Sequence, residues 1–158
     1  KGKQHILRII REILTANPSG RGTDLKGALQ FIHNVLKKRS VCFILSDYLA
    51  TGYDHALRVL ARRHDCIGIH CWDPLERDLP DVGVLRVADA ETGEQTWVDT
   101  TSSFMRYQYQ QTFEVHRLET QNLFRRAGAD FLSLCTNQPY VRALLRFFAQ
   151  RSKIVAHG

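Results

Sequence analysis

The chain has 158 residues and a net charge of +6, with 44% hydrophobic and 24% charged residues. These values are ordinary for a globular protein, and a chain of this length can bury a sizeable core, so they argue against disorder. No apolar run approaches the roughly 20 residues that span a bilayer, and no signal peptide is recognisable. We therefore expect a cytoplasmic chain with no membrane partner in this segment.

The positive charge is concentrated at the two ends of the chain. Residues 1–40 contain nine Lys or Arg against two Asp or Glu, residues 41–103 contain five against eleven, and residues 104–158 contain eight against three. Because the basic residues fall mostly on amphipathic helical patterns, a solvated helix face is their ordinary explanation. Nucleic-acid binding through these helices is therefore an alternative and not the main prediction.

The four cysteines predict neither a disulfide framework nor a zinc site. They form no Cys-x-x-Cys pair, and each lies in an apolar, strand-like run: Cys42, Cys66, Cys71 and Cys135. We interpret them as small buried residues of a reducing compartment.

Two amphipathic helices open the chain. Apolar residues recur at helical spacing over residues 3–16, and Asn17-Pro18 ends this helix because Pro cannot continue it. The loop Gly20–Thr23 leads into a second helix over residues 24–38, whose basic end suits the negative end of a helix dipole. The apolar stripes of both helices are expected to face a sheet.

A βαβ unit follows. Val41–Leu45 is an unbroken apolar run, which is typical of a strand covered on both faces. A helix at Tyr53–His64 connects it to a second apolar strand at Cys66–Trp72. Strand, helix and strand in this order predict two parallel strands with a right-handed crossover.

The rest of the chain adds a hairpin, a strand and two helices. Residues 84–89 and 95–98 flank a Gly-containing loop and predict a β-hairpin. A long helix is predicted from Ser102 or Ser103 to Ala127, with Gly128 as its C-cap, then a strand at 131–135 and a helix at 141–150. The fold class is therefore α/β, a parallel sheet with flanking helices and an inserted hairpin. Residues 1–151 form the domain, and 152–158 a flexible tail.

The carboxyl ends of the predicted strands carry hydroxyl and carboxylate side chains. Ser46-Asp47 ends the first strand, Asp73-Pro74 the second and Thr136-Asn137 the third. Ligands of open parallel sheets bind outside this edge, which the loop Gly20–Asp24 joins if its helix packs beside the first strand. Oxygen donors without clustered His or Cys suit a hard cation such as Mg²⁺, although an Asp here is more often a turn former.

No catalytic residue can be assigned. Ser46 lacks a Gly-x-Ser-x-Gly elbow and a His partner, and Gly20-x-Gly22 lacks the third glycine of a dinucleotide fingerprint. His70 lies in a predicted strand and is interpreted as a hydrogen-bonded core residue. The helical histidines are expected to face solvent: His55, His64 and His116. The sequence thus predicts a binding module and not an enzyme.

Several motifs, taken in order, resemble a known family. Gly20–Leu25, then a helix, then Phe43–Asp47 are similar to the second half of a von Willebrand factor A-type domain. More closely, the chain resembles the MoxR-associated subgroup catalogued as domain-of-unknown-function family fifty-eight. Further stretches that fit are Ala61–Asp65, Asp73–Gly83, Glu91–Glu94, Arg125–Phe131 and Leu144–Phe148. The resemblance covers about Lys1 to Arg151 and implies an incomplete von Willebrand A-type domain with a Rossmann-like sheet.

The resemblance implies a metal-ion-dependent adhesion site. The family's ligands come from three loops: an Asp-x-Ser-x-Ser motif, a Thr and an Asp. Thr23 matches the Thr and Asp47 the last Asp, whereas Asp-x-Ser-x-Ser is absent from the chain and is expected upstream of Lys1 with three further strands. Two ligands do not fill the six oxygen positions that Mg²⁺ prefers, so Mg²⁺ is expected in the intact protein and not in this segment alone.

The same resemblance implies a role in protein–protein interaction. A partner's acidic side chain would complete the cation's shell, and a MoxR-type AAA+ ATPase would act with the protein on an unknown client. The rival functions are nucleic-acid binding and a metal-dependent hydrolase that uses the acidic rim; neither has a recognisable motif. Because Val41–Leu45 would lack one neighbouring strand, we also expect a homo-oligomer held through this edge and the first two helices.

Overall fold

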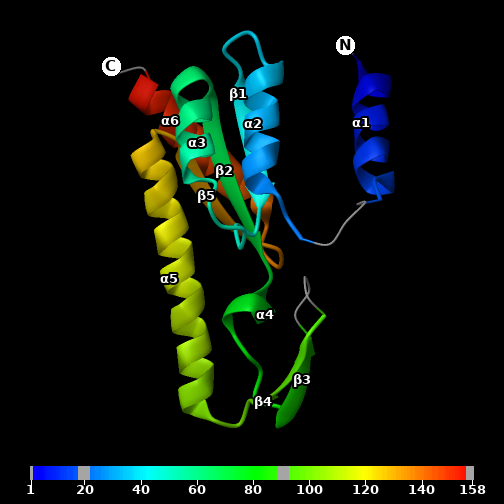
Figure 1. Ribbon diagram of the computed structural model, residues 1–158, viewed down its shortest axis with the longest axis vertical. Helices are drawn as coiled ribbons and strands as arrows, with labels where there is room; N and C mark the ends of the chain where they lie inside the picture. Colours follow the sequence, from blue (N-terminus) through cyan, green and yellow to red (C-terminus); the bar gives the residue numbers. More distant parts are fainter. Residues whose placement is uncertain (1, 18–21, 89–92, 156–158) are drawn as a thin grey trace.

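The computed structural model describes residues 2–17, 22–88 and 93–155, and it has the predicted α/β fold (Figure 1). A three-stranded parallel sheet is flanked by helices, and a two-stranded hairpin lies apart from it. In chain order the elements are α1 (Lys3–Thr15), α2 (Leu25–Val35), β1 (Val41–Ser46), α3 (Asp54–Arg63), β2 (Asp65–Trp72), α4 (Pro74–Arg77), β3 (Val84–Ala88), β4 (Gln95–Asp99), α5 (Ser103–Ala127), β5 (Asp130–Cys135) and α6 (Tyr140–Val155).

Strand β2 is the centre of the sheet. It pairs in parallel with β1 on one side and with β5 on the other, so the predicted parallel βαβ pairing is confirmed. Its residue Gly68 lies against α5: a Cβ atom here would fall 2.4 Å from Cε1 of Phe124. Only glycine therefore allows α5 to approach the middle of the sheet this closely.

Helices cover the two faces of the sheet unequally. The main core is formed by α2, α3 and α5 on the face that carries Cys42, Ile44 and Cys66. Side chains alternate between faces along a strand, so Phe43 points the other way, where its ring lies 6.2 Å from that of Phe148 on α6. Arg151 fixes the end of α6 by binding Asp65 at 2.6 Å and Asp130 at 2.8 Å.

The prediction that Val41–Leu45 is covered on both faces is wrong. Burial alternates along β1: Cys42 and Ile44 are buried, while Val41 and Leu45 are 55% and 64% exposed. In the described part of the chain β1 pairs with β2 alone, so it is an edge strand. The strand is as apolar as predicted, but no described element packs over Val41 and Leu45, and this explains the difference from the prediction.

Helix α1 forms where its periodicity predicts it, but its apolar stripe is not buried. None of its residues is buried, and Ile13 and Leu14 are 70% and 79% exposed. Figure 1 shows α1 standing apart from the sheet and from the helices that cover it. The spacing of apolar residues determines that this segment is helical and which face of the helix is apolar. Burial of that face also needs a surface to pack against, and no described element supplies one.

Other elements match the predictions with small differences. Ser102 caps α5, and Gly128 ends it in the left-handed conformation with φ 75°. The short helix α4 was not predicted, and α6 runs to Val155. Cys71 is exposed, unlike the other three cysteines. Two predicted loops fall partly outside the described residues, at 18–21 and 89–92. No helix within the described ranges is long and apolar enough to cross a bilayer.

His70 is the core histidine that the sequence predicts. It is buried in β2, stacks against Phe113 and Phe131, and its Nδ1 lies 3.3 Å from Oγ of Ser133. Burial lowers its pKa from 6.5 to about 4; nearby His116 and Arg117 act in the same direction, and Asp47 opposes them. The folded protein therefore holds a neutral imidazole over a pH range in which an unfolded chain binds a proton.

We predict that acid weakens the fold through His70. Its contribution is fully present above pH 6.5 and is lost as the pH falls towards 4, which amounts to about 2 kcal/mol between pH 7.5 and pH 5. Urea unfolding at both pH values should give a smaller pH difference for His70→Gln than for the unchanged protein. The exposed His55→Gln is the control, and an unaltered pH difference in His70→Gln would contradict the assignment.

We also predict self-association through the free edge of β1. The strand has an exposed apolar face and neither charge nor Pro, so nothing in it prevents pairing with another strand. Light scattering at micromolar concentration should find a dimer or larger species. Leu45→Lys, at an exposed position, should shift it to monomer. A monomeric unchanged protein would refute the prediction.

Candidate functional site

The carboxyl ends of the strands form one polar rim. Asp73, after β2, accepts a hydrogen bond of 3.0 Å from Oγ1 of Thr136, after β5, and the backbone N–H of Thr136 donates to the carbonyl oxygen of Trp72. Thr23 lies just before α2, which begins at the end of the sheet where β1 finishes at Ser46, followed by Asp47 (Figure 1). Thr23 and Asp47 are both exposed, and no hydrogen bond joins them in the described residues.

A tight turn orients the carboxylate of Asp47. Its Oδ1 accepts hydrogen bonds from Oγ of Ser46 at 3.3 Å and from the backbone N–H of Leu49 at 3.1 Å. The backbone N–H of Tyr48 in turn donates to Oγ of Ser46 at 3.0 Å. These hydrogen bonds use only Oδ1 of Asp47 and stabilise the turn. The second carboxylate oxygen, Oδ2, remains at the exposed rim.

Tyr48 anchors this turn. It is the only non-glycine residue with a positive φ in the described chain, at 60°, a region that costs a bulky side chain energy. Its side chain is 1% exposed, and its hydroxyl donates to the carbonyl oxygen of Ile44. The ring lies 5.2 Å from that of Phe124 and 5.9 Å from that of Phe131. Packing therefore holds the strained residue, and with it the direction of Asp47.

Asp24, the residue after Thr23, stabilises the start of α2. Asp24 is the N-cap of α2, since its Oδ1 accepts from the backbone N–H of Gly27 at 2.8 Å. A Cβ atom on Gly27 would fall 2.2 Å from Oδ2 of Asp24, so a larger residue here would displace the capping carboxylate from its present position. The cap fixes where α2 starts and so places Thr23 at the rim.

Most acidic residues of the rim also stabilise local structure. Asp73 and Glu76 form a capping box on α4, with Asp73 N–H donating to Glu76 at 2.7 Å. Asp78 pairs with Arg77, and Asp81 with Arg106. These groups are caps and surface ion pairs, so only Asp47 remains a strong candidate ligand among them.

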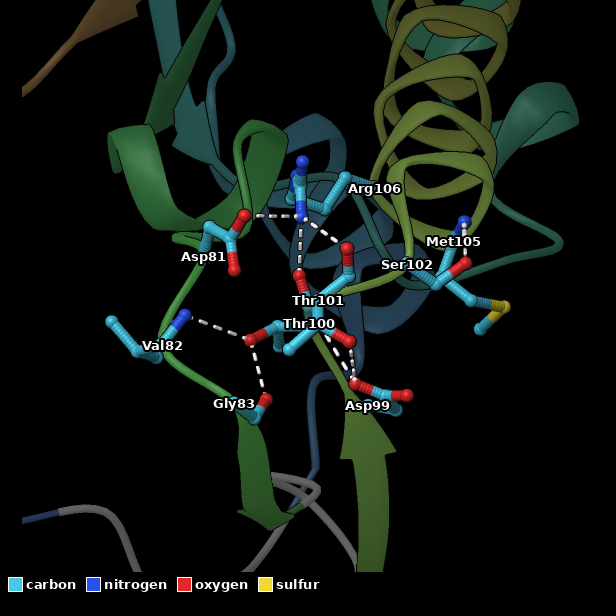
Figure 2. Close-up of polar contacts among 9 residues, drawn as sticks. All are labelled: Asp81, Val82, Gly83, Asp99, Thr100, Thr101, Ser102, Met105 and Arg106. Carbon is cyan, nitrogen blue, oxygen red and sulfur yellow. Dashed lines mark hydrogen bonds and ion pairs between the residues drawn. The ribbon is translucent and has the colours of Figure 1, made fainter.

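A buried threonine joins the hairpin to α5, as Figure 2 shows. The hydroxyl of Thr100 donates to the carbonyl oxygen of Gly83 at 2.6 Å, and the backbone N–H of Val82 donates to that hydroxyl at 3.2 Å. Arg106, in the first turn of α5, donates to the carbonyl oxygens of Thr100 and Thr101 and pairs with Asp81 at 3.1 Å. The base of the hairpin is thereby fastened, a role that no local sequence signal marks.

A pocket of about 480 Å³ opens beside the Asp47 turn. The loop after β1 forms one wall and α5 the other, with charged or titratable side chains from both: Asp54, His116, Glu119 and Arg126. Tyr53, on the wall formed by the loop after β1, is hydrogen-bonded to the side chain of Thr120, and burial raises the pKa of its hydroxyl to about 12. Sequence analysis missed this pocket because its walls are more than sixty residues apart in the chain.

The described residues alone do not complete a magnesium site. No group of three or more His, Cys, Asp or Glu among them is placed to hold an ion. Thr23 and Asp47 offer a hydroxyl and a carboxylate, which suit a hard cation in kind, but Mg²⁺ needs near-octahedral oxygen coordination.

The comparisons identify the family. The chain belongs to the family described as Protein of unknown function DUF58, whose model matches residues 1–119. It is similar to uncharacterized proteins of Mycobacterium bovis and Mycobacterium tuberculosis, each 31% identical over 96% of this chain and 49% of the relative. An uncharacterized protein of Mycobacterium avium is 30% identical over 96% of this chain and 89% of that protein.

The chain spans about half the length of the first two relatives. No solved structure matches it. The family part of the sequence-based resemblance is thus confirmed, while the likeness to von Willebrand A-type domains and the link to MoxR-type ATPases stay predictions.

We predict that Tyr48→Gly is more stable than Tyr48→Ala by about 1 kcal/mol. Both variants lose the same ring, but only glycine adopts a positive φ without strain. Urea unfolding measures the difference. Arg58, exposed in α3, gives the matched control, because there the Gly variant should be the less stable of the two. Equal stabilities at position 48 would show that the turn is not strained.

Proposed function

We propose that this chain is part of a von Willebrand A-like binding module and not of an enzyme. In the intact protein, Thr23 and Asp47 would supply two oxygen ligands to Mg²⁺, and residues outside this chain the rest. The observation that carries the proposal is the Asp47 turn, which holds one carboxylate oxygen and leaves the other at the exposed end of β1.

The geometry of the rim supports a role in recognition. A cation at this edge would have an open side facing solvent, because Thr23 and Asp47 are both exposed. An acidic side chain of a partner protein fits such an open position, since carboxylate oxygens are the donors that hard cations prefer. The buried side chain of Tyr48 holds the turn rigidly, and the two proposed ligands remain exposed at the rim, where a partner can reach them.

The partner follows from the family resemblance. We propose that the protein works with a MoxR-type AAA+ ATPase in assembling or maturing another protein complex. Its client carries the acidic group that the cation recognises. Membership in the family supports this proposal, and the length of the relatives leaves room for the missing ligands.

We predict that Thr23→Ala and Asp47→Ala each abolish Mg²⁺-dependent partner binding in the intact protein. Both side chains are exposed, so the free energy of unfolding should change by less than about 1 kcal/mol. Calorimetric titration with Mg²⁺ is the measurement, with Asp54→Ala, another exposed acid near the rim, as the control. Unchanged cation affinity in both variants would exclude the site.

A further inference from the structure

Two histidines lie near each other at the C-terminal ends of α2 and α3, and three of their ring nitrogens are buried without a hydrogen-bond partner among the described residues. His33 lies on α2, and His64 is the C-cap residue of α3. The expectation that His64 faces solvent is wrong, because it is only 2% exposed. Neither of its ring nitrogens has a partner among the described residues, and nor does Nδ1 of His33. Buried polar groups are almost always hydrogen-bonded, so this pair calls for an explanation.

The centres of the two rings are nearly as close as those of two imidazoles that bind one ion. Their centroids are 6.4 Å apart, and their planes are nearly perpendicular, at 85°. An imidazole bound through one nitrogen has its ring centre roughly 3 Å from a zinc ion, so two such rings have centres roughly 5 to 6 Å apart. The observed separation of the two ring centres, 6.4 Å, is therefore close to that of two imidazoles bound to one zinc ion.

Space for additional ligands lies next to the pair. His33 lines a cavity of about 270 Å³ between α2 and α3, together with Gln30, Asn34 and His55. A water molecule takes up roughly 30 Å³ in the liquid, so the cavity can hold the waters that complete the coordination of an ion.

The donor atoms select the kind of ion. Imidazole nitrogen suits borderline ions such as Zn²⁺ and is a poor ligand for Mg²⁺ or Ca²⁺. Burial lowers the pKa of His64, and the charges of Arg63 and His33 act in the same direction. The ring is therefore neutral near pH 7, which is the form that binds a metal.

We propose that His33 and His64 form a two-histidine site for a borderline divalent ion, with Zn²⁺ as the fitting member. The protein supplies two ligands and water the others, in keeping with the absence of any larger cluster in the described chain. The ion fastens the C-terminal ends of α2 and α3 to each other. This site is distinct from Thr23 and Asp47, because the rim lies at the opposite, N-terminal end of α2.

The test uses the chelator-treated chain and Zn²⁺ alone. We expect one ion bound per chain by calorimetry, and a rise in Tm of roughly 10 °C at 100 times the Kd. His33→Asn and His64→Asn should each remove the rise. His55→Asn, which lines the same cavity, should keep it, and Mg²⁺ should not produce it.

A further variant separates metal binding from folding. His64→Leu replaces the unpartnered ring with an apolar side chain, so without metal it should fold and be at least as stable as the unchanged protein. It should lose the response to Zn²⁺. The proposal is overturned if Zn²⁺ does not raise the Tm of the unchanged protein, or if the rise survives in both His33→Asn and His64→Leu.

Discussion

The contact between Gly68 and Phe124 is the constraint on which the candidate site depends. Because the central strand has no side chain at Gly68, α5 can lie close to the sheet and bury Phe124 completely. Phe124 then packs against the rings of Tyr48, just after β1, and of Phe131, near the start of β5. The direction in which Asp47 points is thus set by a packing contact on a different strand. A larger residue at position 68 would disturb the rim without touching it.

At the Asp47 turn, packing around Tyr48 offsets the strain of its backbone conformation. A tyrosine with a positive φ is unfavourable by itself, and it persists only where the surroundings hold it more strongly. Here a hydrogen bond to Ile44 and an aromatic cluster do so. A turn held in this way does not relax when solvent or a partner approaches, which is useful where a carboxylate must keep its position.

The two ends of the sheet have different chemistry. At the carboxyl ends of the strands, oxygen donors gather at the rim with Thr23 and Asp47. At the other end, where α2 and α3 finish, the buried His64 and the half-buried His33 lie near each other, and no hydrogen-bond partner reaches the ring of His64 among the described residues. Both arrangements follow from α/β topology, because α2 and α3 run antiparallel to the strands, so that both helices start at the carboxyl ends of the strands and finish at the other end of the sheet.

The sequence by itself determined the elements and much of the rim. Periodicity placed the helices and strands, Gly128 and Ser102 marked the limits of α5, and the family resemblance singled out Thr23 and Asp47 as candidate ligands. The short helix α4 was missed, although Asp73-Pro74 and Glu76 are the pattern of a capped helix start. These features depend on neighbours in the chain, and local chemistry is sufficient to read them.

Only the tertiary structure decided which residues are buried and which distant residues come into contact. Apolar patterns that each predicted burial gave a buried β2, a half-exposed β1 and an α1 without a buried residue, because burial depends on the surface opposite and not on the pattern. His33 and His64 are thirty-one positions apart, and the walls of the pocket beside Asp47 more than sixty. Contacts over such separations come from the packing of whole elements, which no stretch of sequence encodes locally.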